Sequence, residues 1–435
     1  MKLSKKSFFG ASIGTMVEYY DYALFAIFIP IIAPLFFRGE TAYQSLSKGY
    51  LILMITSLAQ PLGGLLFGYI GDFFGRRKAL LASMYGIAIA TFIMGITPSY
   101  QTIGIWSLII ILITKAIQKF CFGGEFNGAG IYVVEHARNQ NEIYTSSILS
   151  ATTFTGSLVA SIIGILLTAS FMPDWSWRLA FVLGGVIGAI GIFYRKNLLE
   201  SPQFKEANSN QHNLRQLLRK FPKELLAGFF IGGLCTVPFT TVITFINPVL
   251  MTEKYFTGQQ FMLVETYLII VSIITLVVIA LTAENKKPEN IMRFGATGLI
   301  LFSYVLLLLI YKGSLFVILI AQSLMIVMNE IMIAPSHAYF KKIFDLEFRY
   351  RAASFSFCLG LAVFGGLTPV IESKLYKMTG HFSSAAIWVM FVSIGTYLFI
   401  WLNQRKVSML VEPLSISSCH YCERSTEGAY RENIK

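Results

Sequence analysis

Ionisable side chains inside long apolar runs are the residues of this sequence best placed to do chemistry. Glu18 and Asp21 stand three residues apart in the first apolar run, and Tyr22 extends the same face. Residues three apart are neighbours on a helix, so the two carboxyl groups should lie close together. Two carboxylates in a medium of low dielectric constant do not both ionise easily. The pair could bind and release a proton, or it could simply form ion pairs with buried lysines.

A later apolar run carries the opposite charge. Lys115 and Lys119 stand one helical turn apart, too deep for their ammonium groups to reach either membrane surface comfortably. We expect anionic partners for both, either the acidic residues of the chain or the carboxylate of a bound solute. Direct solute binding and charge neutralisation without solute contact are both open. Gln118 and Glu125 lie on nearly the same helix face and could line a cavity, and Glu330 is a polar candidate in the second half.

The composition explains why these charges are informative. The chain has 435 residues, of which 55% are hydrophobic and only 13% are charged, and its mean hydropathy is +0.64. An ordinary soluble domain carries about 25% charged residues. We therefore expect a helical membrane protein, in which buried charges face a cavity or one another.

Several other function classes lack support. No Ser-His-Asp, metal-ligand or nucleotide-binding pattern occurs at useful spacing, so we expect neither an enzyme nor an ATP-driven pump, and no cofactor or metal. Cys419 and Cys422 form a single C-x-x-C pair, whereas a structural zinc site needs four ligands. The net charge of +12 is better explained by membrane topology than by nucleic acid.

Twelve apolar segments are long enough to cross a bilayer as helices. They cover residues 8–36, 49–71, 79–98, 104–134, 145–171, 177–195, 223–250, 258–282, 291–311, 314–340, 352–374 and 382–402. We expect an all-α membrane protein with twelve transmembrane helices in two six-helix halves, at 1–195 and 223–402. A basic cytosolic loop at 196–222 joins the halves, and a cytosolic tail follows at 403–435. Most of the 35 Lys and Arg residues fall on the side that is cytosolic when both termini are inside, which predicts this orientation in the lipid bilayer.

A glycine-spaced charged turn, Gly68 to Lys78, joins the second and third segments. Asp72 lies at its helix end, and Arg76 and Arg77 follow on the same surface. An Asp in this place can stabilise the positive N-terminus of a helix from the other half, and the segment after Arg349 is the candidate. We interpret these residues as a cytosolic gate, with a merely solvated turn as the alternative.

The chain resembles the major facilitator superfamily, and within it the metabolite:proton symporters, most of all the proline/betaine transporters. The stretches that carry the resemblance are Glu18-Tyr-Tyr-Asp-Tyr22, Pro98-Ser-Tyr100, Thr102 to Trp106, Lys115, Gln118, Gly123-Gly-Glu125, Trp177-Arg178, Leu199 to Phe204, Arg349-Tyr350 and Gly365 to Pro369. The likeness covers nearly the whole chain and is more specific in the first half.

The resemblance implies proton-coupled import of a small zwitterionic osmolyte, such as proline or glycine betaine, by alternating access. It also implies a bacterial inner membrane and a monomer. Lys119 departs from the family pattern, because a glycine is expected there, and this extra charge favours a second hypothesis, uptake of a carboxylate metabolite. A third hypothesis is a transport-inactive membrane sensor.

The gate hypothesis makes a direct prediction. Asp72→Asn removes the charge that would stabilise a helix N-terminus across the two halves, so it should slow solute uptake into proteoliposomes. Uptake at the rate of the unchanged protein would rule out an essential gating role for Asp72.

Overall fold

The computed structural model describes residues 5–37, 41–136, 142–169, 171–173, 175–196, 214–255, 257–283 and 285–411, and every regular element within these ranges is helical. The elements of the first half are α1 (Lys5–Phe36), α2 (Ala42–Ser57), α3 (Ala59–Phe73), α4 (Arg76–Ile96), α5 (Tyr100–Ile103), α6 (Ile105–His136), α7 (Glu142–Leu167) and α8 (Trp177–Arg195). Those that follow are α10 (Leu214–Lys220), α11 (Pro222–Phe239), η2 (Thr240–Ile246), α12 (Asn247–Thr252), α13 (Gly258–Thr282), α14 (Pro288–Lys312), α15 (Leu315–Ile333), α16 (Ser336–Ile343), α17 (Arg349–Gly360), η3 (Leu361–Gly365), α18 (Gly366–Thr379), η4 (Phe382–Ala385) and α19 (Ala386–Val411).

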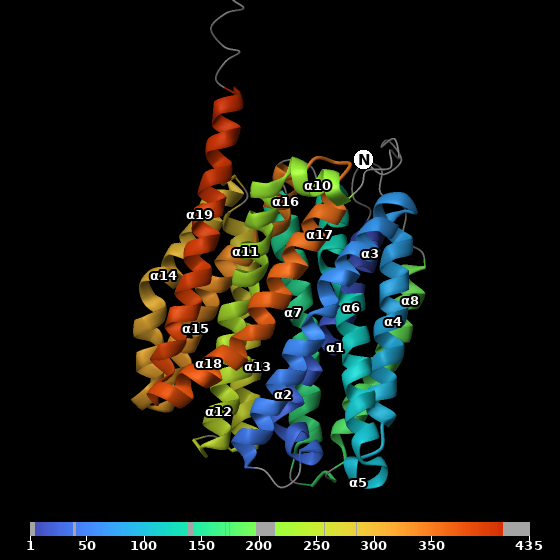
Figure 1. The fold of residues 1–435 in the computed structure, drawn as a ribbon, viewed down its shortest axis with the longest axis vertical. Coiled ribbons are helices and arrows are strands. Elements are labelled where there is room, and N and C mark those ends of the chain that lie inside the picture. Colours follow the sequence, from blue (N-terminus) through green and yellow to red (C-terminus); the bar gives the residue numbers. More distant parts are fainter. Residues whose placement is uncertain are drawn as a thin grey trace, which may run out of the picture.

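The helices form two bundles that stand side by side, the first blue to green and the second yellow to red in Figure 1. In the described ranges, 12 helical stretches are long and apolar enough to cross a membrane, which confirms the predicted number of spans. Phe193, Leu281 and Phe294 are 68%, 70% and 71% exposed on the outside of the bundles. Large apolar side chains in this position are suited to lipid rather than to water.

Two helices extend beyond the predicted apolar segments, because hydropathy detects only the apolar part of a helix. The second segment was predicted to begin at 49, whereas α2 begins at Ala42, about two turns earlier. Thr41 starts this helix with a capping box: its hydroxyl accepts from the Gln44 N–H at 3.2 Å, and the Gln44 side chain accepts from the Thr41 N–H at 3.0 Å. At the other end, α19 continues to Val411, beyond the predicted end at 402.

Several spans of the second half are interrupted. Pro335 separates α15 from α16, as its lack of an N–H predicts. The widened turns of η2 and η3 interrupt the spans that begin with α11 and α17. Turns of this kind are frequent at functional sites.

Close glycine contacts hold together the first and fifth spans of each half. A Cβ atom on Gly156 of α7 would lie 1.9 Å from the Met16 carbonyl oxygen of α1. A Cβ atom on Gly360 of α17 would lie 1.9 Å from the Phe229 carbonyl oxygen of α11. Only glycine allows the backbones to approach so closely, which is how small residues pack membrane helices.

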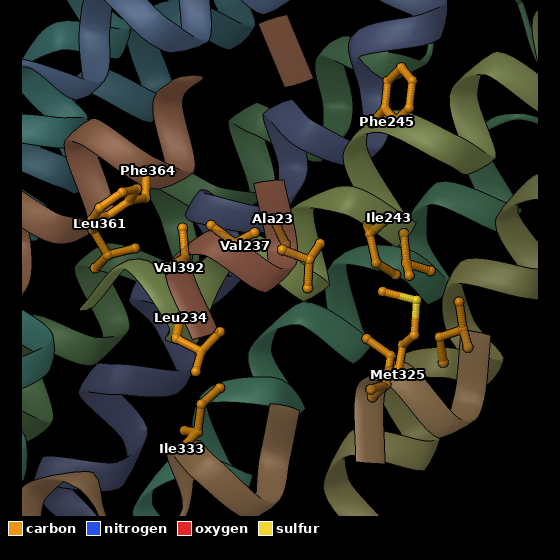
Figure 2. Packing of buried hydrophobic residues seen from close by; sticks show 14 of the residues in the cluster. Ala23, Leu234, Val237, Ile243, Phe245, Met325, Ile333, Leu361, Phe364 and Val392 are labelled. Carbon is orange, nitrogen blue, oxygen red and sulfur yellow. The ribbon is translucent and has the colours of Figure 1, made fainter. Parts of the chain in front are cut away.

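A continuous apolar cluster fills the space around the interrupted helices (Figure 2). It combines residues of α1, α11, η2, α15, η3 and α19, which are far apart in the sequence. The residues labelled in the figure are Ala23, Leu234, Val237, Ile243, Phe245, Met325, Ile333, Leu361, Phe364 and Val392. Because it contains residues of α1, α2, α6 and α8 as well as of the second half, the cluster also joins the two halves.

The glycine contacts predict a difference between two small substitutions. Gly156→Ala should lower the stability of the detergent-solubilised protein by about 1–3 kcal/mol, because the methyl group forces α1 and α7 apart. Gly258→Ala is the matched control, since its Cβ would meet only Met251 Cε at 3.7 Å. Thermal unfolding measures both, and equal midpoints for the two variants would contradict the packing argument.

Candidate functional site

A cavity of about 110 Å³ lies between the two halves, with walls from both. This is room for a small solute or several water molecules. The first half contributes the tyrosines of α1 and the lysines of α6, and the second half contributes a row of hydroxyl groups. The row consists of Thr236, Thr240 and Thr244, spaced four residues apart along α11 and η2. The irregular turns of η2 and η3 therefore form part of the cavity wall.

The two lysines of α6 both line this cavity, and aromatic rings lie beside their ammonium groups. Lys119 Nζ lies 4.0 Å from the centroid of the Tyr22 ring and 5.9 Å from that of Phe122. Lys115 Nζ lies 4.8 Å from the centroid of the Phe25 ring. A cation within about 6 Å of a ring face is attracted by the ring quadrupole. We predicted acidic partners for both lysines, so the aromatic contacts are a feature that spacing along the sequence did not reveal.

The predicted acid pair lies directly beside the lysines. Glu18 and Asp21 are 3% and 2% exposed, and Asp21 is adjacent to both Thr91 and Lys115. Gln118 donates from Nε2 to the Thr91 hydroxyl at 2.5 Å. The structure brings six of the predicted site residues around one small cavity of about 10 Å³, enough for about one water molecule. They are Glu18, Asp21, Tyr22, Lys115, Gln118 and Lys119.

One other predicted residue, Glu330, is not part of this group. Glu330 is fully buried near Ser272 and Cys235. Of these three residues, Cys235 lines the central cavity, and the other two do not. Glu330 therefore lies behind the cavity wall rather than in it. The side chain of Glu125 lies outside the described residues, as do those of Asp72 and Arg76.

Two buried polar groups in the second half were not among the predicted site residues. Glu372 of α18 is fully buried and accepts a hydrogen bond from the Thr241 hydroxyl at 2.7 Å. Asn247 connects two neighbours: it donates to Glu265 Oε1 at 2.9 Å and accepts from Gln322 Nε2 at 2.6 Å. A lone acid within the apolar run 352–374 was the available signal for Glu372.

The cytosolic side is closed by ion pairs between the halves. Arg349 of α17 pairs with Glu135 of α6, Nη1 to Oε1, at 3.3 Å. Lys341 of α16 pairs with Glu142 of α7, Nζ to Oε1, at 2.6 Å. Glu135 was not among the predicted site residues, although its side chain is buried in this ion pair.

The helix packing around these ion pairs also crosses the interface. α3 packs along α17, and a Cβ atom on Gly71 would lie 3.3 Å from the Tyr350 ring. Arg351 lies over the rings of Tyr69 and Phe73, at 5.6 Å from each centroid. Arg77, a predicted gate residue, donates to the carbonyl oxygen of Lys196, which directly follows α8.

The outer side has a different character. A hollow of about 760 Å³ lies between α2 and α18 and extends to Glu253 at the end of α12. One cross-half contact lies within it, between the Tyr43 hydroxyl and Ser373 Oγ at 2.7 Å. The described structure is thus closed by charges toward the cytosol and hollowed toward the outside, with the central cavity between.

Comparisons with known proteins agree with this architecture. The sequence profile of the Major Facilitator Superfamily matches residues 11–349. A putative proline/betaine transporter of Staphylococcus aureus (strain COL) is 28% identical over 409 residues, covering 92% of this chain and 88% of the relative. The proline/betaine transporter of Escherichia coli (strain K12) is 24% identical over 408 residues, covering 90% and 81%. The solved proton:xylose symporter XylE bound to 6-bromo-6-deoxy-D-glucose shares the fold, with a TM-score of 0.76 at 15% identity over 91% of this chain and 95% of that one.

The cytosolic ion pairs predict how the two halves separate. Glu135→Gln removes the negative charge from the buried ion pair with Arg349, and breaking such a pair is strongly destabilising to the closed arrangement. Cys358 reports the opening, because its thiol is buried against the Gly123 carbonyl of the other half, with Sγ 3.1 Å from the oxygen. We expect its labelling by a maleimide reagent, followed by mass spectrometry, to become roughly tenfold faster or more.

The control for this experiment is Asp345→Asn. It removes an ion pair with Lys220 whose side chains are 58% and 52% exposed and which joins α10 to the second half rather than one half to the other. Exposed pairs of this kind contribute little, so Cys358 labelling should stay at the rate of the unchanged protein. Equal rates in Glu135→Gln and Asp345→Asn would show that the Glu135 pair does not hold the cytosolic side closed.

Proposed function

The chain belongs to the major facilitator superfamily and is a multi-pass transporter, and we propose that it is a proton-coupled symporter for a small solute bound by its carboxylate group. The observation that carries this proposal is the pair of cavity-lining lysines beside the buried Glu18 and Asp21. Proline and glycine betaine, which the names of the relatives suggest, both contain such a carboxylate. We further propose that the protein acts as a monomer in a bacterial inner membrane.

Binding would begin at the lysines. A carboxylate between Lys115 and Lys119 offsets the repulsion of two ammonium groups held one turn apart in a medium of low dielectric constant. Hydroxyl groups from the opposite wall, such as Thr236 and Thr240, can donate to the remaining lone pairs of the carboxylate oxygens. The solute would then contact both halves, which is the requirement for a site around which the halves rock.

Charge balance would couple the solute to the proton. While Asp21 is ionised, it neutralises the adjacent Lys115. A proton on Asp21 removes this neutralising charge and leaves Lys115 to a solute carboxylate. A solute of net charge −1 and a proton together add no net charge to the buried site, whereas either alone leaves an uncompensated charge in the membrane. A zwitterion has no net charge, so with a proton it adds one positive charge. Glu18, on the same helix face, would modulate the exchange.

Contacts at the two ends of the molecule would control from which side of the membrane the central cavity is accessible. The solute would enter from the outer hollow, where Tyr43 and Ser373 form the described contact between the halves. Release to the cytosol would require the ion pairs of Glu135 and Glu142 to separate. These pairs lie at the cytosolic end, where water can replace each partner.

A carboxylate metabolite is the second candidate for the solute. The observation in its favour is that no described side chain lining the central cavity is acidic, although two are lysines. A zwitterion brings a positive group for which the cavity shows no acidic partner among these residues.

Uptake of labelled proline and glycine betaine into proteoliposomes tests the proposal. An inward gradient of one pH unit supports about tenfold accumulation of a solute that enters with one proton, because one unit corresponds to about 1.4 kcal/mol. Asp21→Asn should abolish this accumulation while leaving exchange of internal for external solute intact. Asp345→Asn is the control, since its side chain is 58% exposed and far from the cavity lining.

Two results would contradict the proposal in different ways. Undiminished accumulation in Asp21→Asn would exclude this carboxyl group as the proton carrier. Absence of any accumulation by folded, unchanged protein would exclude proline and glycine betaine, and it would direct the search to carboxylate metabolites and then to a transport-inactive sensor.

A further inference from the structure

The central cavity contains the components that would recognise an organic cation. Quaternary ammonium groups bind to faces of aromatic rings within about 6 Å of the centroid. Tyr19, Tyr22 and Phe122 all line the cavity and pack against one another, with ring centroids 4.8 Å apart for Tyr22 and Phe122 and 5.5 Å apart for Tyr19 and Phe122. On ring chemistry alone, this aromatic group would suit the trimethylammonium end of a betaine.

The protein itself already occupies this aromatic group with a cation. Lys119 Nζ lies 4.0 Å from the Tyr22 centroid and 5.9 Å from the Phe122 centroid, and the residue is 8% exposed. A ligand's ammonium group at the same rings would lie within a few ångströms of Lys119. Like charges about 4 Å apart repel strongly where the effective dielectric constant is well below that of water.

The rest of the cavity wall does not compensate for a second cation. Lys115 adds another positive charge, and the other described lining groups are aromatic, aliphatic, thiol or hydroxyl. Asp21 lies beside Lys115 around the smaller neighbouring cavity and is absent from the described lining of the central one. Among the described lining residues of the central cavity, the charges that a bound solute would meet are therefore positive.

The outer hollow carries the same sign of charge. Lys48, Lys374 and Lys377 line it, and its one acid among the described lining residues is Glu253. The Glu253 carboxylate already accepts a hydrogen bond from the Tyr376 hydroxyl at 2.6 Å. A hollow lined by one sign of charge raises the local concentration of ions of the opposite sign. Entrance and central cavity thus favour an anion independently.

We propose that Lys119 is a specificity-determining residue, whose ammonium group fills the aromatic cation site so that the transporter selects carboxylates with an uncharged apolar body over zwitterions. This inference rests on the proposed binding of a carboxylate between Lys115 and Lys119, and it decides between the two solute classes left open above. Tyr22 acts in two ways: its ring holds the Lys119 ammonium group, and it forms part of the apolar wall for the solute body.

A pair of ligands that differ in a single atom tests the inference. In 3,3-dimethylbutanoate a carbon atom replaces the quaternary nitrogen of glycine betaine, so shape and carboxylate are kept and only the positive charge is lost. Cyclopentanecarboxylate has the same relation to proline. Because weak acids also cross lipid unaided, the measurement is binding, not uptake. Thermal stabilisation of the purified protein in lipid nanodiscs, titrated with each ligand, yields the Kd values by mass action.

The unchanged protein should bind 3,3-dimethylbutanoate roughly tenfold or more tightly than glycine betaine, which is the usual scale of a single ammonium–aromatic or charge contact. Lys119→Met keeps the length of the side chain and removes its charge, so the ratio should fall to one or reverse. Lys115→Met is the matched control. It removes the other cavity cation but leaves Lys119 at the Tyr22 ring. Binding of both ligands should therefore become weaker, while the ratio of their Kd values stays the same.

Each alternative result overturns the inference. These results are equal binding of the two ligands by the unchanged protein, absence of binding by either, or the same ratio in Lys119→Met as in the unchanged protein. The ratio in the unchanged protein decides the matter even if a variant fails to fold. Failure of the proposed function is separate: it would show as an intact preference for the anion in binding, together with no effect of a proton gradient in proteoliposomes.

Discussion

The cost of placing charge in a membrane is the constraint on which this structure depends. A single charged side chain at the bilayer centre costs about 2.5–3.5 kcal/mol even on the most lenient scale. This chain places Glu18, Asp21, Lys115 and Lys119 together in its first half, where they line one small cavity. Their mutual compensation makes the group tolerable, and any change in proton or solute occupancy shifts the balance. A site that is stable only when its charges cancel is suited to taking up an anion and a proton together.

The described residues that the second half contributes to the cavity wall carry no charge, so this half avoids the cost of placing charge at the cavity. Its wall presents the hydroxyl groups of Thr236, Thr240 and Thr244, and its buried acids lie outside the described lining. Glu265 and Glu372 instead accept hydrogen bonds from Asn247 and Thr241. The two halves therefore have different tasks: the first holds the charges, and the second supplies neutral donors and the irregular turns of η2 and η3.

Movement between the halves requires contacts that are firm within each half and reversible between them. Within the halves, Gly156 and Gly360 bring helix backbones into direct contact, and no water or lipid can replace that packing. Between the halves, the cytosolic contacts are ion pairs such as Glu135 with Arg349, whose partners water can solvate after separation. This difference in chemistry separates the rigid parts from the moving interface. Lys119 contributes neither to the packing within a half nor to the contacts between the halves. Its proposed role is to select which solute binds in the central cavity.

Much of the architecture was determined by the sequence alone. Hydropathy and the distribution of Lys and Arg predict twelve spans and their orientation, because lipid requires long apolar helices and the cytosol retains basic loops. Helical spacing placed Glu18 near Asp21 and Lys115 near Lys119, since residues three and four apart share a face. The start of α2 at Ala42 was not predicted, because the capping box of Thr41 and Gln44 that begins this helix has no hydropathy signal.

Only the tertiary structure decided which partners these residues meet. It placed Lys119 against the ring of Tyr22, and it buried Glu135 against Arg349. These contacts join α6 to α1 and to α17, helices far apart in the chain. Spacing along one helix specifies a face but not what that face meets. The partner depends on how the helices pack, and that packing is set by many weak contacts across the whole molecule.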